Sequence, residues 1–230
     1  MKLFIDSANL GLITKFIRMG VVDGVTTNPT LLAKEGRDPS EQVAKILEAC
    51  PGDVSIEVIS TEYEGMIREA RAISKLGRNA VTKIPMTQEG LRAVRTLSDE
   101  GIRTNVTLVF SSAQALLAAK AGATYVSPFA GRLDDIGHSG MKLVSDIMQV
   151  FQNYSFGTQL LVASVRHPLH VIRAAKLGAH VATIPPDVLE RMFTHPLTDS
   201  GLKRFLDDWS SLSKQLGKPI SMSDEFIKGP

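Results

Sequence analysis

Short runs of apolar and β-branched residues recur eight times along the chain, and segments with the apolar spacing of helices lie between them. The runs cover residues 2–6, 24–28, 54–59, 80–85, 102–108, 124–129, 159–165 and 180–185. Strands that alternate with helices predict a parallel sheet, and eight such units in 230 residues are typical of a closed barrel. We therefore expect an α/β protein with a single (β/α)₈ TIM barrel and an additional C-terminal helix at about residues 198–215. A doubly wound open sheet is the alternative, disfavoured by the count of eight and by the lack of a glycine-rich first turn.

The expected helices have recognisable ends. Thr87 is suited to cap the start of one helix, because its hydroxyl can accept a hydrogen bond from a free backbone N–H. Gly77, Gly101, Gly122 and Gly178 each follow a helical pattern and are expected at helix C-termini. We expect one catalytic domain over residues 1–216, which includes the last helix, and a C-terminal tail over residues 217–230.

The composition is that of an ordinary globular protein, with 43% hydrophobic and 22% charged residues and a net charge of +2. Neither this balance nor any run of Lys and Arg indicates nucleic acid or an anionic membrane as a partner. No apolar run approaches the length of a membrane-spanning helix. Cys50 is the only cysteine and an aspartate already stands at position 6, so we expect no intrachain disulfide, no signal peptide and a cytoplasmic location.

A lysine interrupts one of the eight runs. Lys83 stands within "AVTKIPM" (80–86), where small and β-branched residues predict a buried strand. Removing an ammonium from water costs several kcal/mol unless something compensates. A snorkelling surface lysine is the alternative interpretation, and for this residue alone a functional role is only modestly favoured.

Polar residues stand near the end of almost every expected strand, although strands buried on both faces should be nearly all apolar. They are Asp6, Asn28, Glu57, Lys83, Asn105, Thr107, Ser127, Ser164 and Arg166. Residues two apart in a strand share a face, which places three pairs at the rim together: Asn105 with Thr107, Ser127 with Phe129, and Ser164 with Arg166. For Asn28 or Ser127 alone, capping the next helix is as good an explanation as function. Together the residues predict an active site at the carboxyl ends of the strands.

The chemistry of this rim is narrowed by what the sequence lacks. No HExxH, CxxC or G-x-S-x-G motif is present, so we expect neither a metal site nor a serine hydrolase. The five histidines (138, 167, 170, 180 and 195) have no metal-ligand spacing and are expected at the surface or at helix starts. Asp134 and Asp135 are expected in turn and cap roles. An amine among carboxylates remains, which is the equipment for a Schiff base with a carbonyl substrate.

Four segments resemble the transaldolase family. They are "DGVTTNPTLLAKEG" (23–36), "VTKIPMTQEGLRAVRTL" (81–97), "TNVTLVFSSAQALLAAKAGATYVSPFAGRLDDIG" (104–137) and "LVASVRHPLHV" (161–171). The resemblance extends to about residue 210, and the short chain is similar to the small transaldolase and fructose-6-phosphate aldolase subfamily.

The resemblance implies a function and a set of catalytic residues. Dihydroxyacetone would pass from sedoheptulose 7-phosphate to glyceraldehyde 3-phosphate, giving erythrose 4-phosphate and fructose 6-phosphate in the pentose phosphate pathway. Lys83 would form the Schiff base with the ketose, and Asp6 would take the proton from the C4 hydroxyl. No metal or organic cofactor would be needed, because the lysine iminium is the electron sink. Glu57 and Thr107 would hold a water that moves protons.

The resemblance also implies binding residues and an assembly. Asn28, Asn105 and Ser127 would bind the dihydroxyacetone fragment with Phe129 beside it, and Arg132, Ser164 and Arg166 would hold the phosphate. An ion pair of Arg132 with Asp134 or Asp135 is the alternative for that arginine. Sugar phosphates are the expected partners, together with further copies of the chain in a pentamer or decamer.

Two rival functions remain open. Fructose-6-phosphate aldolase, a lyase, shares the lysine and Asp6, but its pattern has glutamine in place of Glu57 and tyrosine in place of Phe129. A barrel that binds sugar phosphates without turnover is the other, and nothing in the sequence favours it.

Overall fold

A computed structural model describes residues 1–218 and 220. The chain forms two compact units, of which the first comprises Met1–Arg191 and the second begins at Met192.

The first unit is a closed barrel of eight parallel strands in the order β1 to β8. The strands are β1 (Lys2–Asp6), β2 (Gly24–Thr26), β3 (Val54–Glu57), β4 (Ala80–Pro85), β5 (Thr104–Val109), β6 (Tyr125–Pro128), β7 (Gln159–Val162) and β8 (Val181–Ile184). Each strand overlaps its predicted range, and β8 pairs with β1 in parallel register to close the sheet. The predicted fold class is therefore confirmed.

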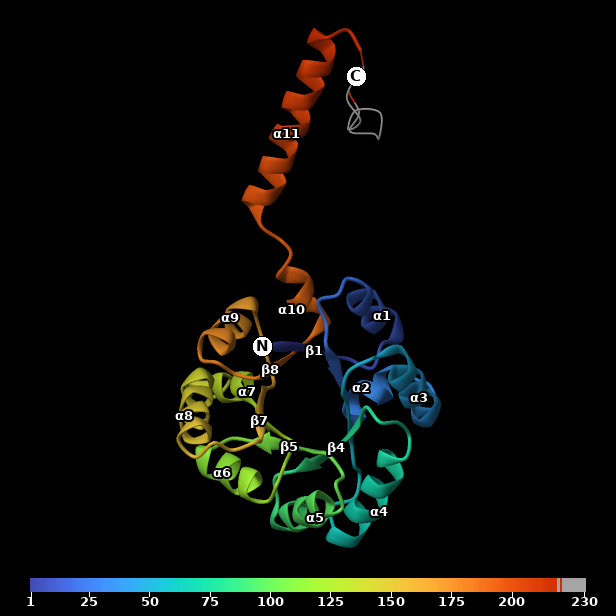
Figure 1. The fold of residues 1–230 in the computed structure, drawn as a ribbon, viewed down its shortest axis with the longest axis vertical. Helices are drawn as coiled ribbons and strands as arrows, with labels where there is room; N and C mark the ends of the chain where they lie inside the picture. Colours follow the sequence, from blue (N-terminus) through green and yellow to red (C-terminus); the bar gives the residue numbers. More distant parts are fainter. Residues whose placement is uncertain (219, 221–230) are drawn as a thin grey trace. The chain divides into compact units, whose positions relative to one another are not determined.

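Helices surround the strands as a ring (Figure 1). In this unit they are α1 (Leu10–Arg18), α2 (Pro29–Lys34), α3 (Pro39–Ala49), α4 (Tyr63–Ser74), α5 (Gln88–Asp99), α6 (Ser112–Lys120), α7 (Ala130–Asp134), α8 (Gly140–Asn153), α9 (Pro168–Lys176) and α10 (Pro186–Arg191). They follow one another clockwise in Figure 1, and because βαβ crossovers are right-handed, the view is from the end where the strands begin. The sequence had not indicated the short helices α2, α7 and α10.

Most of the predicted helix ends are confirmed. The Thr87 side chain accepts a hydrogen bond from the Gly90 N–H at the start of α5. Gly101, Gly122 and Gly178 have φ angles of 73°, 93° and 78°, a left-handed conformation that glycine adopts without a side-chain clash. The prediction for Gly77 is wrong, because α4 ends at Ser74 and its C-cap is the residue that follows.

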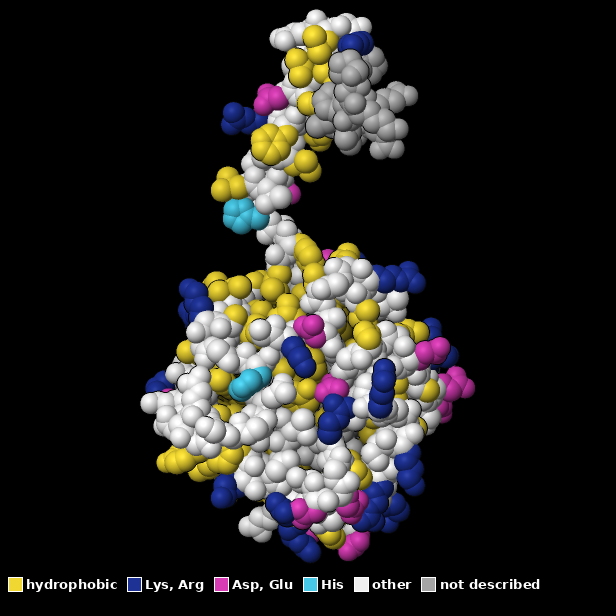
Figure 2. Space-filling view, in the orientation of Figure 1, with side chains coloured by type: hydrophobic (Ala, Val, Ile, Leu, Met, Phe, Trp, Pro, Cys, Tyr) yellow, Lys and Arg dark blue, Asp and Glu magenta, His cyan; other side chains and the backbone are white. Residues whose placement is uncertain are grey.

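The barrel interior contains a buried apolar cluster that comprises Phe4, Val81, Tyr125, Leu161, Ala163 and Val181. A hydrogen-bonded group with charged side chains lies where the strands begin. The Tyr125 hydroxyl donates to Asp53 Oδ2 at 2.7 Å, and Arg103 Nη1 lies 2.6 Å from Asp53 Oδ1. Charged side chains also gather near the centre of the face at this end (Figure 2). A packed and hydrogen-bonded base therefore leaves the opposite end for chemistry.

The second unit contains α11 (Pro196–Gln215), which corresponds to the predicted last helix. Hydrophobic side chains lie along it (Figure 2), and Leu202, Phe205 and Leu206 are exposed. The predicted domain boundary at residue 216 stays a prediction, and the predicted tail, 217–230, lies almost wholly outside the described residues. None of the described helices combines the length and apolar character needed to cross a bilayer.

Candidate active site

Lys83 lies inside the barrel and is 6% exposed. Its Nζ is 2.9 Å from Glu57 Oε2 and donates a hydrogen bond to the Thr27 carbonyl oxygen at 2.8 Å. Glu57 and Lys83 are direct neighbours in the β3–β4 register, which places both side chains on the inner face. The compensation that a buried ammonium requires is therefore a carboxylate and a backbone carbonyl.

Asp6 stands at the end of a chain of hydroxyls that the sequence analysis missed. Thr26 Oγ1 donates to Asp6 Oδ1 at 2.7 Å and lies 2.6 Å from Thr183 Oγ1. Because the single Thr26 proton goes to the carboxylate, Thr183 must be the donor to Thr26. Burial raises the pKa of Asp6 above its usual value, opposed by the Thr26 hydrogen bond and the charge of Lys83. Thr26 is paired with Asp6 in the β1–β2 register, a signal that only the strand alignment reveals.

Asn105 is fully buried and engaged at both ends of its amide. Its Oδ1 accepts from Ser127 Oγ at 2.7 Å, and its Nδ2 donates to Ser55 Oγ at 3.1 Å. One proton and one lone pair of the amide remain for a ligand. Ser55 is a further residue that the sequence analysis did not identify.

The Thr107 side chain, unlike that of Asn105, lacks a hydrogen-bond partner within the described part of the chain. Its Oγ1 is buried and has no hydrogen-bond partner among the described residues. A buried polar atom without a partner is costly, and a site that awaits a ligand or water is one physical reason for it. The hydroxyl borders the same cavity as Lys83, so a bound substrate or water there could supply its missing hydrogen-bond partner.

The loop after β7 carries two of the predicted residues, but not in the way the strand argument assumed. β7 ends at Val162, and Ser164 has a left-handed φ of 58°, so the two-residue alternation does not relate Ser164 to Arg166. Gly131 permits the close approach of this loop, because a Cβ there would lie 1.9 Å from the Ser164 carbonyl oxygen.

The two arginines have different surroundings. The Arg132 guanidinium lies 5.0 Å from the centre of the Phe129 ring, a cation–π geometry. Asp135 forms its ion pair with Arg166. For this carboxylate, the structure therefore does not show the alternative interpretation of Arg132, an ion pair with Asp135.

The capping interpretation of Asn28 is correct as far as it goes. Its side chain accepts a hydrogen bond from the Leu31 N–H at 2.9 Å and so caps α2. The same side chain borders the cavity at the barrel mouth, so the two interpretations do not exclude each other.

Two adjoining cavities at the mouth bring all the predicted site residues together. The first is lined by Asp6, Asn28, Lys83, Asn105, Thr107, Ser127, Phe129, Arg132, Ser164 and Arg166, and by the unpredicted Thr26 and Thr183. The second shares six of these residues and adds Glu57, Lys34 and Leu108. The arrangement offers a buried amine, two carboxylates, several hydroxyls and two guanidinium groups to one ligand.

The histidines lie where they were expected, at the surface or at helix starts. His167 and His195 stand at the N-cap positions of α9 and α11, and His138 and His180 are exposed. His170 lies in the first turn of α9 and is buried, with 3% exposure. No group of three or more His, Cys, Asp or Glu within the described part of the chain could hold a metal ion.

Comparison with known proteins agrees with this geometry. The family model for transaldolase/fructose-6-phosphate aldolase matches residues 3–216. The chain belongs to this family. Relatives named "Probable transaldolase" from Anaeromyxobacter dehalogenans and Methanococcus maripaludis are each 59% identical, over 93% and 92% of this chain and 99% and 98% of theirs.

The barrel also resembles a solved structure of low sequence identity. It is a Coccidioides immitis protein described as a "putative fructose-1,6-biphosphate aldolase", with a TM-score of 0.57 and 15% identity. The similarity covers 86% of this chain and 81% of that one, and it concerns the fold alone.

Proposed function

We propose that this member of the family is a transaldolase. It would move a dihydroxyacetone unit from sedoheptulose 7-phosphate to glyceraldehyde 3-phosphate, giving erythrose 4-phosphate and fructose 6-phosphate in the pentose phosphate pathway. One observation carries the proposal: the buried Lys83 amine shares a cavity at the barrel mouth with Asp6 and is paired with Glu57. The relatives named "Probable transaldolase", which this chain matches over nearly their full lengths, support the same reaction.

The steps follow from the groups present. The Glu57 carboxylate, 2.9 Å from Lys83 Nζ, takes a proton from the ammonium. The neutral amine then attacks the C2 carbonyl of the ketose, and the carbinolamine loses water to form an iminium. Asp6 takes the proton of the C4 hydroxyl while the electron pair of the C3–C4 bond moves into the iminium, which leaves an enamine and releases the aldehyde. The enamine then attacks the acceptor aldehyde, Asp6 returns its proton to the new oxygen, and water hydrolyses the iminium. The lysine iminium is the electron sink, so the proposal requires no metal or organic cofactor.

Glu57 and Thr107 are suited to move protons during carbinolamine formation and loss. The Glu57 carboxylate is 2.9 Å from the Lys83 amine, and the unpartnered Thr107 hydroxyl borders both cavities. A water between them would receive a hydrogen bond from Thr107 and donate one to Glu57.

Substrate recognition divides between two sides of the mouth. We assign the dihydroxyacetone fragment to Asn28, Asn105 and Ser127, whose remaining donors and acceptors match hydroxyl groups. We assign the phosphate to Ser164, Arg132 and Arg166, because guanidinium groups bind dianionic oxygens bidentately.

The lyase reaction of fructose-6-phosphate aldolase is the second candidate. Phe129 packs edge to face against Phe110, with ring centres 5.8 Å apart, and offers no proton to an enamine. Glu57 is ionisable where the lyase pattern has an amide. Both residues favour transfer to an aldehyde over protonation and release.

We also propose that the enzyme is a cytoplasmic homo-oligomer, a pentamer or decamer. The exposed leucine and phenylalanine side chains of α11 support association, because they leave apolar surface uncovered in a single chain. The cytoplasm is where charged sugar phosphates are retained.

Borohydride reduction in the presence of fructose 6-phosphate tests the chemistry. The wild-type enzyme should acquire a covalent adduct that peptide mapping assigns to Lys83, and Lys83→Met should show neither the adduct nor turnover. Lys120→Met, which changes an exposed lysine at the end of α6, is the matched control and should retain both. Turnover by Lys83→Met would contradict the proposal.

A further inference from the structure

His170 is buried beside the loop that carries Arg166, and both of its ring nitrogens are occupied. The Arg166 backbone N–H donates to His170 Nδ1 at 3.3 Å, and His170 Nε2 lies 2.9 Å from Asp134 Oδ2. A ring nitrogen that accepts an N–H carries no proton, so the proton of a neutral ring is on Nε2 and is donated to Asp134. The two partners therefore select one neutral tautomer of His170.

Asp134 connects this contact to the next helix. Its Oδ1 accepts a hydrogen bond from the Gly140 N–H at 2.8 Å, at the start of α8. The Arg166 backbone is thus linked through two side chains to a rigid element of the barrel wall.

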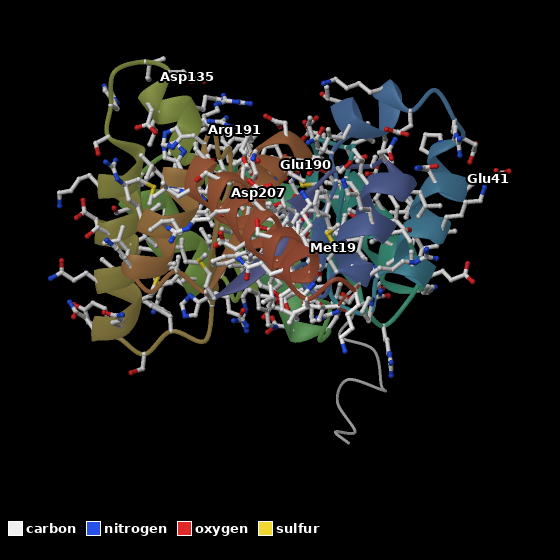
Figure 3. The ribbon with its side chains drawn as sticks, turned by 90° about the horizontal axis from the view of Figure 1, so that it is seen from above. Met19, Glu41, Asp135, Glu190, Arg191 and Asp207 are labelled. Atoms are coloured by element: carbon white, nitrogen blue, oxygen red, sulfur yellow. The ribbon has the colours of Figure 1, made fainter. Side chains whose placement is uncertain are left out.

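The Arg166 side chain is held in two further places. Its Cγ would lie 2.7 Å from a Cβ on Gly131, so the side chain crosses the backbone of α7 where only glycine leaves room. Its guanidinium is paired with Asp135. Figure 3 shows Asp135 at the edge of the barrel, in the segment that follows α7. Because its partner Arg166 borders the mouth cavity, Asp135 lies next to the phosphate-binding residues proposed above.

The loop itself needs such support. Ser164, two residues before Arg166, holds a left-handed φ of 58° that costs a non-glycine residue free energy. A conformation of this kind persists only where its surroundings determine it, and the His170 acceptor is one of those surroundings.

The surroundings of His170 favour the neutral ring. Burial lowers the pKa of His170 most. The His167 ring, tilted with its centre 3.9 Å away, and Arg173 lower it further. Asp134 acts in the opposite direction. The Nδ1 lone pair thus remains available to Arg166 at neutral pH.

We propose that His170 is a positioning residue: through the Arg166 backbone it sets the guanidinium that binds phosphate, and so favours phosphorylated over non-phosphorylated sugars. The inference rests on the proposed function only in assigning the phosphate to Arg166. The part of the substrate concerned is its phosphate monoester group. The chemistry at Lys83 does not depend on His170.

Three substitutions separate the two nitrogens. His170→Leu removes both contacts, His170→Asn keeps an acceptor at the place of Nδ1, and His170→Gln keeps a donor near the place of Nε2. The matched control is His180→Leu, because His180 Nδ1 also accepts a backbone N–H, that of Leu160 at 3.0 Å, where the strands begin.

The readouts are the Kd for inorganic phosphate by calorimetry, the KM for fructose 6-phosphate, and borohydride trapping of dihydroxyacetone on Lys83. We expect His170→Leu and His170→Gln to weaken phosphate binding and raise KM by about tenfold, with trapping of the phosphate-free ketone unchanged. His170→Asn should stay close to wild type, and His180→Leu should change none of the three.

Several outcomes would overturn the inference. They are an unchanged phosphate Kd in His170→Leu, a loss in His170→Asn as large as in His170→Leu, or an equal loss of dihydroxyacetone trapping. Failure of the proposed function would look different, because the wild-type enzyme would then trap no ketone on Lys83 whatever its phosphate affinity.

Discussion

The Lys83–Glu57 pair makes a prediction about stability that is independent of catalysis. Lys83→Met fills a similar volume but removes the ammonium, and so leaves the Glu57 carboxylate and the Thr27 carbonyl without their partner. Removing one partner of a buried ion pair costs about 3–5 kcal/mol. The Glu57 side chain is 17% exposed and keeps some water, so we expect the lower end, about 3 kcal/mol.

A second substitution should restore part of this loss. In Lys83→Met/Glu57→Gln the remaining side chain is a neutral amide, whose burial costs much less than that of a carboxylate. We expect the double variant to be more stable than Lys83→Met by about 2 kcal/mol. For a chain of this size, the loss in Lys83→Met corresponds to a fall in Tm of about 6–12 °C.

Urea unfolding followed by circular dichroism, at one protein concentration, measures these differences. Lys142→Met is the control, because its partner Asp146 lies four residues away on the exposed face of α8, and such pairs contribute about 0.5 kcal/mol or less. The comparison also needs Glu57→Gln alone. If the losses of Lys83→Met and Glu57→Gln simply add in the double variant, the pair is not coupled in the folded protein and the reasoning is refuted.

Other predictions concern single residues of the mouth. Asp6→Asn should abolish turnover yet stabilise the fold. Burial raises the pKa of Asp6, so its stabilising contribution is full below the unfolded pKa of about 4 and is lost as pH rises through the higher folded pKa. In thermal unfolding the variant should therefore gain on wild type as pH rises above about 4. Arg132→Ala should raise the KM for phosphorylated substrates by about 10- to 150-fold, and an equal loss with non-phosphorylated analogues would contradict the phosphate role. Phe129→Tyr, and further Glu57→Gln with it, should increase dihydroxyacetone release relative to transfer; a constant product ratio would remove the preference for the transferase. Activity should survive EDTA, and recovery that depends on added metal would argue against the Schiff-base mechanism.

Local patterns in the sequence were sufficient for the elements and for the residues at their ends. Asp6, Glu57, Lys83 and Thr107 could be selected because they are polar residues near the ends of otherwise apolar runs, where the strands of such a barrel carry the active site. The same holds for the Thr87 cap, because capping involves atoms only three residues apart. Gly77 shows the limit of such rules, since the helix before it ends early and the glycine is not its cap.

Contacts between distant segments were decided by the tertiary structure. Thr26 and Thr183 are hydrogen-bonded across 157 residues, and only closure of the barrel makes them neighbours. The tertiary structure also decides which arginine pairs with Asp135. The left-handed turn at Ser164 and the close approach of the chain over Gly131 bring Arg166 to this carboxylate.

The partners of His170 were decided in the same way. The sequence placed it at a helix start, but only the fold buries it and brings Asp134 and the Arg166 backbone to its two ring nitrogens. Periodicity is a property of one element, and it determined which residues face the barrel and which reach its mouth. Which side chains pair with one another depends on how the strands are aligned and how the loops cross. Alignment and crossing follow from packing over the whole chain, and no local pattern encodes that packing.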